Sequence, residues 1–361
     1  MNNKLPIIYF FLTVSAFICN AQTIKPGFNG AEYKELLEIV GKLRDSMPDV
    51  STSKYKLVYR SPRMGFKNCY EAWEGNNNTG VIHIQGTIAD AVSWLANFYC
   101  PMIKAQGQLQ INDSTVFDYK LADNASAYVH TGWLTSLAHM APGILTQINA
   151  MQAKGINQIY LLGHSQGGAI TFLLTSYLRH LQLEGKLDNN IVFKSYCSAA
   201  PKPGNLYYTY DFDFITRNGY AYRVVNTEDW VPEAPFSLQT VNDFNSANPF
   251  VNAKKSIKQQ KFLTRIYLNS VYNKLNGSTT KAMKTFRKQL GKKLFKVVKK
   301  NLPQYKEPQY VYSQNYTPAG VAIVLMADND YKSKFVFDGK NVFVHHLLKP
   351  YVDLLDKQYS K

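Results

Sequence analysis

The chain has 361 residues, of which 45% are hydrophobic and 14% aromatic, so it can bury a sizeable core and is not an intrinsically disordered protein. For an α/β protein, this length requires only one large domain. The formal net charge of +16 is concentrated in one segment. No acidic residue lies between Asp243 and Glu307, whereas sixteen Lys or Arg residues fall between Lys254 and Lys306. The rest of the chain is therefore close to neutral.

The N-terminal segment is typical of a cleaved secretory signal. A lysine precedes an apolar run over residues 6–18, and small residues then end at Ala21. The run is too short to span a bilayer. Cys19 offers an alternative as a lipoprotein acylation site, but the residue before it is bulky. We therefore predict a signal peptide over residues 1–21, a mature domain over residues 22–361, and a protein that is secreted or lies in the periplasm or cell envelope.

Cysteine content argues against a disulfide framework. Cleavage after Ala21 leaves Cys69, Cys100 and Cys197, a small and odd number for an exported protein. At most one bridge could form among them, so disulfides are not expected to hold the fold.

Short apolar runs rich in β-branched residues alternate along the chain with helical patterns, such as residues 168–181. Runs of this kind are typical of strands buried on both faces of a parallel sheet. The runs that we predict to be strands cover residues 56–59, 81–84, 159–162, 191–196 and 222–225. Their alternation with helices predicts one mostly parallel sheet covered by helices on both faces.

A Gly-x-Ser-x-Gly pattern at residues 163–167 stands between a predicted strand and a predicted helix. At ordinary Gly and Ser frequencies the pattern arises by chance in roughly one chain of this length in ten, so its context decides its meaning. A sharp strand-to-helix turn lifts the Ser165 hydroxyl clear of the backbone. The helix N-terminus, beginning with Gln166, offers free N–H groups to a developing negative charge. The alternative is a glycine-rich turn with a structural serine.

A serine nucleophile needs a histidine to accept its proton and a carboxylate to hold that histidine. Asp229 follows the apolar run that ends at Val225, in a loop at the carboxyl end of a predicted strand. Active sites of open α/β sheets form at these ends. His345 and His346 stand near the C-terminus at the entrance to a predicted short helix. The sequence therefore offers Ser165, Asp229 and one of two histidines as a catalytic set.

Several further motifs follow one another in a fixed order along the chain. They are VIHIQGT (81–87), SWLANF (93–98), VHTGW (129–133), GHSQGG (163–168), SAAPKPGN (198–205), NTEDWVP (226–232) and YTPAGVAIVLM (316–326). Together they resemble the class 3, or fungal-type, lipases, over most of the chain from about Tyr55 to Leu355. The resemblance implies an α/β-hydrolase fold.

The same resemblance implies roles for individual residues. Thr87 and Gln166 correspond to the two backbone donors of the oxyanion hole. His346 is favoured over His345, because Tyr351 lies five residues after His346 and reproduces the histidine-to-tyrosine spacing of the family. The sequence departs from the family at Gln85, where members often have an arginine.

The basic segment, residues 252–306, lengthens the stretch between the acid and the histidine beyond what the family core needs. We predict a helical insert or cap, with the NGS sequence at residues 276–278 as a turn between two helices. In its second half, apolar side chains gather within roughly 40° of Leu290 on a helical wheel. They are Met283, Phe286, Leu290, Leu294 and Val297.

Two interpretations of this apolar stripe remain open. It could pack on the hydrolase core while the lysines are solvated, or it could form part of a surface over residues 254–306 that binds an anionic membrane. Nucleic acid is not an expected partner, because no DNA-binding motif is present and the protein is predicted to be exported.

These observations predict a secreted serine hydrolase that cleaves carboxylic ester bonds through an acyl-enzyme, with an acylglycerol or another hydrophobic ester as substrate. The predicted chemistry requires neither a cofactor nor a metal ion. The alternative is a non-catalytic or weakly active protein of the same fold that binds lipid or the cell envelope through its basic lobe.

Overall fold

The computed structural model describes residues 24–42 and 50–359. The predicted signal peptide and Cys19 lie outside these residues. The helices are α1 (Gly30–Gly41), α2 (Ala91–Phe98), α3 (Thr131–Ala153), α4 (Gln166–Leu183), α5 (Leu206–Ile215), α6 (Ala253–Lys258), α7 (Phe262–Phe286), α8 (Leu294–Asn301), α9 (Asn329–Lys334) and α10 (Leu348–Tyr359). The strands are β1 (Tyr55–Arg60), β2 (Tyr70–Gly75), β3 (Thr79–Ile84), β4 (Met102–Lys104), β5 (Gln106–Gln110), β6 (Val116–Lys120), β7 (Tyr128–His130), β8 (Gln158–His164), β9 (Val192–Ser198), β10 (Gly204–Asn205), β11 (Ala221–Asn226), β12 (Tyr316–Thr317) and β13 (Val321–Leu325).

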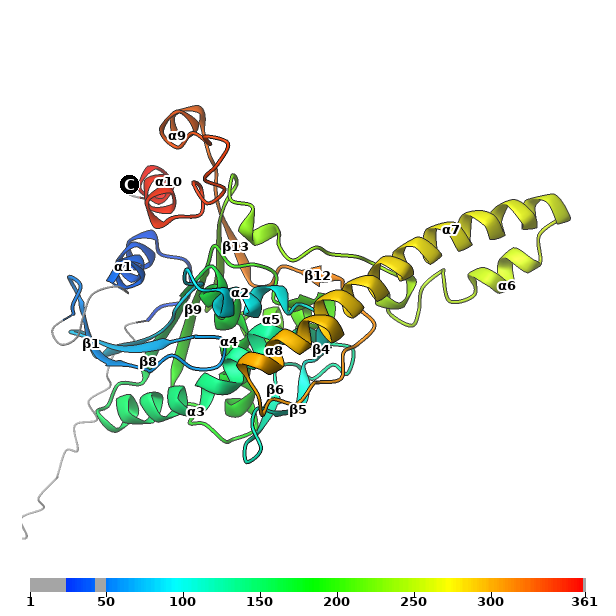
Figure 1. The fold of residues 1–361 in the computed structure, drawn as a ribbon. Coiled ribbons are helices and arrows are strands. Elements are labelled where there is room, and N and C mark those ends of the chain that lie inside the picture. Colours follow the sequence, from blue (N-terminus) through cyan, green and yellow to red (C-terminus); the bar gives the residue numbers. More distant parts are fainter. Residues whose placement is uncertain (1–23, 43–49, 360–361) are drawn as a thin grey trace, which may run out of the picture.

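A seven-stranded sheet in the order β1-β2-β3-β8-β9-β11-β13 forms the centre of the molecule (Figure 1). Within this sheet, β3, β8, β9, β11 and β13 are parallel to one another. At the edge of the sheet, β2 pairs antiparallel with both β1 and β3. The prediction of a mostly parallel sheet is therefore confirmed. Four of the five apolar runs lie within strands of this sheet, namely β1, β3, β8 and β11, and the run at 191–196 begins one residue before β9.

Both faces of the sheet are covered, as its apolar strands require. In β8, Leu161 packs into the core under α3 and α4, whereas the next residue, Leu162, packs into the core on the opposite face, beside α1 and α10. Both side chains are fully buried. This alternation follows from the two-residue period of a strand and explains why the run contains no polar position.

Two smaller sheets complete the fold. One has the strand order β12-β10-β7-β4, and the other is the hairpin of β5 and β6. The sequence analysis predicted neither of these sheets. The strands of the first have only two or three residues, which is too short to show a period.

The basic segment is helical, as predicted, but the turn predicted at residues 276–278 is wrong. Helix α7 continues through this stretch without a break. A single glycine inside a helix costs only about 1 kcal/mol relative to alanine, and the residues on either side continue the helix. After α7, residues Arg287–Lys293 form a π-helical segment that leads directly into α8.

The π-helical segment also corrects the predicted apolar stripe. A π-helix places more residues in each turn than an α-helix, so the buried face shifts along the sequence. Val298 is fully buried, whereas the predicted Val297 is 41% exposed. Val298 packs into the core together with Leu294 and Phe295. The second half of the basic segment is therefore fixed to the body of the protein.

The three cysteines of the described residues, Cys69, Cys100 and Cys197, are buried and form no disulfide with one another. Within residues 24–42 and 50–359, no helix has the length and apolar character needed to cross a membrane.

Candidate active site

Ser165 stands in a tight turn between β8 and α4. Its backbone has φ 61° and ψ −130°, a conformation that is strained for a residue with a side chain. The flanking glycines allow close contact of the backbone. A Cβ atom at Gly163 would lie 2.2 Å from the Gly167 carbonyl oxygen, and one at Gly167 would lie 2.1 Å from that of Ile84. The glycines thus let the turn pack against β3 while the Ser165 side chain remains partly accessible.

Asp229 and His346 form a buried pair. The His346 Nδ1 atom lies 2.8 Å from Oδ2 of Asp229, and the Tyr351 hydroxyl donates a second hydrogen bond to the same oxygen at 2.8 Å. The other oxygen, Oδ1, accepts a hydrogen bond from the Val231 N–H. The carboxylate is thereby fixed, and it holds the imidazole ring in one orientation.

His345 makes different contacts. Its Nδ1 atom lies 2.9 Å from the Tyr331 hydroxyl, and its carbonyl oxygen accepts a hydrogen bond from Asn226. The cavity that holds Ser165 is lined by His346 and not by His345. The structure therefore places His346, which the spacing to Tyr351 favours, in the same cavity as Ser165.

The loop that carries Thr87 lies against the serine turn. A Cβ atom at Gly86 would lie 2.9 Å from the His164 carbonyl oxygen and 3.6 Å from Cβ of Ser165. Thr87 and Gln166 both line the cavity. Within the described part of the chain, neither backbone N–H of these two residues makes a hydrogen bond. Both are thus available to an oxyanion at Ser165.

A polar network that sequence reasoning missed connects these two residues. Asn97 donates a hydrogen bond to the Thr87 hydroxyl, and its Oδ1 accepts one from the Gln166 side chain at 2.8 Å. The His130 ring contacts the Asn97 carbonyl oxygen and thereby helps to fix this network. Asn97 belongs to the quoted SWLANF motif, but only the fold brings it near Gln166.

Gln85, where the family often has an arginine, keeps a cationic neighbour. Its Oε1 atom accepts a hydrogen bond of 2.7 Å from the guanidinium of Arg63. A positive charge is therefore still present beside residue 85, but Arg63 supplies it from another loop.

His164, the residue before the serine, connects the turn to the histidine loop. Its Nδ1 lies 2.9 Å from the Ser198 hydroxyl, and its Nε2 lies 2.8 Å from the carbonyl oxygen of His346. Burial and the neighbouring His346 lower the pKa of His164 to about 3. The ring is therefore neutral at physiological pH, and it fixes the backbone of His346.

This lowered pKa predicts a pH dependence of stability. Between about pH 6.5 and pH 3, the unfolded chain protonates His164 and the folded protein does not, so the free energy of unfolding falls as the pH falls. One such group contributes a slope of up to about 1.4 kcal/mol per pH unit. Urea unfolding of wild type and His164→Asn between these pH values should show a shallower slope in the variant. Equal slopes would mean that the pKa of His164 is not lowered.

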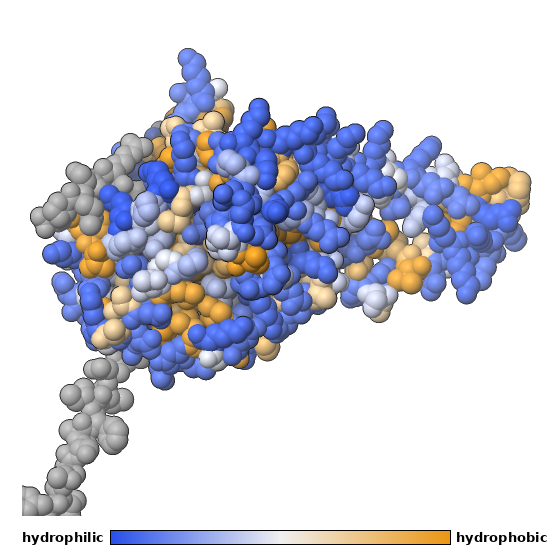
Figure 2. Space-filling model, turned by 60° about the horizontal axis from the view of Figure 1, so that its bottom comes forward, coloured by the Kyte–Doolittle hydropathy of each residue, from blue (hydrophilic) through white to orange (hydrophobic). Residues whose placement is uncertain are grey.

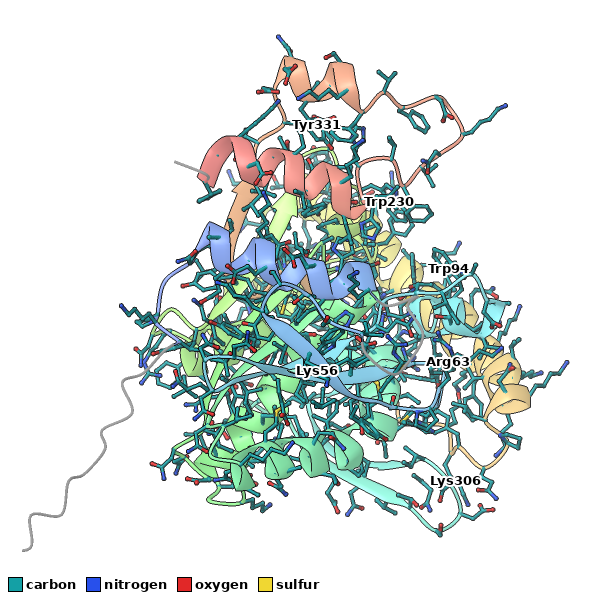
Figure 3. The ribbon with its side chains drawn as sticks, turned by 90° about the vertical axis from the view of Figure 1, so that its left-hand side faces the viewer. Lys56, Arg63, Trp94, Trp230, Lys306 and Tyr331 are labelled. Carbon is teal, nitrogen blue, oxygen red and sulfur yellow. The ribbon has the colours of Figure 1, made fainter. Side chains whose placement is uncertain are left out.

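The cavity at Ser165 has a volume of about 1720 Å³ and is lined mainly by apolar side chains. The Phe343 ring lies 6.0 Å from the Trp94 ring and 5.6 Å from the Trp230 ring, so aromatic side chains from three segments meet at one wall. Figure 3 shows Trp230, Trp94 and Arg63 one below another on the same side of the molecule, and all three line the cavity. Such a cavity suits a large apolar ligand.

The parallel sheet, the strained serine between strand and helix, and the buried Asp-His pair define an α/β-hydrolase. Within that class, residues 81–239 match the family model described as Lipase (class 3). The resemblance to class 3 lipases is thereby confirmed over this stretch, and the chain is a lipase-like carboxylic ester hydrolase.

Solved structures similar to this chain include two fungal lipases. The lipase of a Rhizomucor miehei propeptide complex is 17% identical, with 57% of this chain and 62% of that chain covered and a TM-score of 0.42. Lipase II from Rhizopus niveus is also 17% identical, with 57% and 74% covered and a TM-score of 0.41. No curated protein matches the chain.

Proposed function

We propose that the chain hydrolyses esters of hydrophobic carboxylic acids with Ser165 as nucleophile, His346 as general base and Asp229 as the acid that orients it. The observation that carries this proposal is the buried Asp229–His346 pair, whose histidine lines the same apolar cavity as the strained serine.

The proposed reaction proceeds through an acyl-enzyme. Nε2 of His346 takes the proton of the Ser165 hydroxyl as Oγ attacks the ester carbonyl carbon, and the Thr87 and Gln166 N–H groups stabilise the resulting oxyanion. The C–O bond to the alcohol breaks, and His346 returns the proton to the leaving oxygen. Water then attacks the acyl-enzyme by the same route, which releases the carboxylic acid and restores the serine.

The size and lining of the cavity support a substrate with a long acyl chain. Pockets for small ligands usually measure about 300–1,000 Å³, and this cavity, at about 1720 Å³, is larger. Its charged lining residues are few: Arg63, Lys202 and Glu233. An acylglycerol or another hydrophobic ester fits this description.

The proposal includes export of a single mature domain over residues 22–361, with the basic segment at 252–306 as part of it. Export is supported by the pattern of residues 1–21, in which an apolar run precedes small residues. A substrate present in the cell envelope or outside the cell would be accessible to such a protein.

The direct test measures hydrolysis of p-nitrophenyl esters from acetate to palmitate, together with labelling by a fluorophosphonate. We expect kcat/KM to rise with chain length over the shorter esters, and mass spectrometry to find the label on the peptide that contains Ser165. Folded protein that neither hydrolyses any ester nor takes up the label would favour the alternative, a non-catalytic lipid-binding protein.

A further inference from the structure

Helices α6 and α7 form a hairpin, residues 253–286, that we call the arm, and it projects from the body of the protein (Figure 1). Four apolar side chains at its outer end, which we call the tip, are exposed. They are Phe262 (63% exposed), Leu263 (78%), Ile266 (53%) and Tyr267 (68%). At the 3.6 residues per turn of an α-helix, these four span roughly 140° of the surface of α7. Figure 2 shows hydrophobic atoms at the outermost end of the arm.

The tip is not the surface by which the arm folds on itself. A different side of α7, with Leu268, Val271 and Tyr272, lines a groove together with Ile257 of α6. The helix thus has a second apolar surface in addition to the one turned toward its partner helix. Exposed apolar clusters of this kind mark sites of interaction.

The arm is also strongly basic. Eight of its residues are Lys or Arg and none is acidic. In the described part of the chain, no ion pair joins any of these side chains to a carboxylate. Lys254, Lys255 and Lys258 lie on α6, and Lys261 and Arg265 flank the tip. A partner of the arm therefore has to satisfy positive charge and apolar surface at the same time.

The inner end of the same helix belongs to the candidate active site. Phe286, the last residue of α7, lines the cavity together with Leu290 of the π-helical segment. Phe286 also lies 6.1 Å, ring to ring, from Phe236, which is 79% exposed at the cavity. One helix of 25 residues, about 37 Å long at 1.5 Å per residue, thus connects the tip to the cavity.

We propose that the arm binds the protein to an anionic lipid surface, with the tip inserted among the acyl chains and the lysines in contact with the headgroups. An amphipathic basic helix with exposed aromatic and aliphatic side chains has the chemistry of an interfacial anchor. A nucleic acid would match the lysines but would leave the tip in water. This inference goes beyond the proposed function, because binding does not depend on the serine chemistry.

The test is co-sedimentation of the full chain with vesicles, in a Ser165→Ala background that prevents hydrolysis. Vesicles contain phosphatidylcholine alone or mixed with phosphatidylglycerol. We expect binding to the mixed vesicles only, and a loss of at least about tenfold in affinity as salt rises from about 0.05 M to about 0.5 M, because salt screens the attraction.

Matched variants separate the two parts of the surface. Phe262→Ser with Leu263→Ser should weaken binding to mixed vesicles at least about tenfold. The control is Phe214→Ser with Leu183→Ser. It changes the same residue types at 64% and 61% exposure, and an arginine stacks on the phenylalanine in both pairs.

The lysines of α6 are tested separately. Lys254→Gln, Lys255→Gln and Lys258→Gln together should also weaken binding to the mixed vesicles. The same triple change at Lys25, Lys56 and Lys104, which are also exposed, should not weaken it.

The outcomes distinguish this inference from the proposed function. Equal binding to both kinds of vesicle, or a tip variant that binds like its control, would overturn it. So would a chain that binds DNA but no vesicle. When the native Ser165 is kept, the tip variant should hydrolyse a soluble short-chain ester at the wild-type rate, which shows that the variant is folded. Vesicle binding by a protein without esterase activity would support the arm and reject the proposed function.

Discussion

Ser165→Ala is expected to lower kcat for ester hydrolysis by a factor on the order of 10⁴ to 10⁶, the loss typical of removing a serine nucleophile. The alanine cannot form the acyl-enzyme, and only background stabilisation of attack by water remains. The fold should persist, because the Ser165 hydroxyl makes no hydrogen bond among the described residues. Measurement of kcat on a p-nitrophenyl ester, with thermal unfolding as the check on folding, decides the question.

A double variant provides the internal control. Residues that act as one unit are not additive, so Ser165→Ala combined with His346→Ala should be no slower than Ser165→Ala alone. A further large loss in the double variant would indicate that the two residues contribute separately, and it would contradict the proposed triad.

His346→Ala is expected to reduce kcat/KM by at least about 10²- to 10⁴-fold, the usual contribution of general-base catalysis. Without the imidazole, no group accepts the serine proton, and the carboxylate of Asp229 loses one of its hydrogen-bonded partners. Wild-type protein assayed under the same conditions gives the reference rate.

His345→Ala is the matched control, since it removes the same side chain one residue earlier. Its ring contacts the Tyr331 hydroxyl rather than Asp229, so we expect less than about a tenfold loss of kcat/KM. If His345→Ala is the inactive variant and His346→Ala is active, the assignment of the base is wrong and the two roles are exchanged.

The parts of this protein that the sequence predicts well are those with a local pattern. An apolar run of β8 that is buried on both faces needs no information from the rest of the chain. The glycines around Ser165 are likewise dictated by contacts of a few residues. The preference for His346 comes from the resemblance to class 3 lipases, through the spacing to Tyr351. In the structure, both side chains make hydrogen bonds with the same oxygen of Asp229.

The parts that the sequence does not predict depend on distant residues or on backbone hydrogen bonding. Asn97 and Gln166 are 69 positions apart, and nothing in either neighbourhood indicates that their side chains meet. The contact between His164 and the backbone of His346 spans 182 positions. The π-helical segment changes the period of the basic helix, so a wheel drawn at a constant 100° per residue places Val297 rather than Val298 in the core.

The three buried cysteines have a practical consequence. Burial raises the pKa of Cys100 to about 12, and it raises the pKa of the Cys69 and Cys197 thiols as well. Only the thiolate reacts appreciably with alkylating reagents, so these thiols are nearly inert while the protein is folded. Their reaction rate with such a reagent therefore reports how often the surrounding core opens, and the native protein carries its own probe of local unfolding without any engineered label.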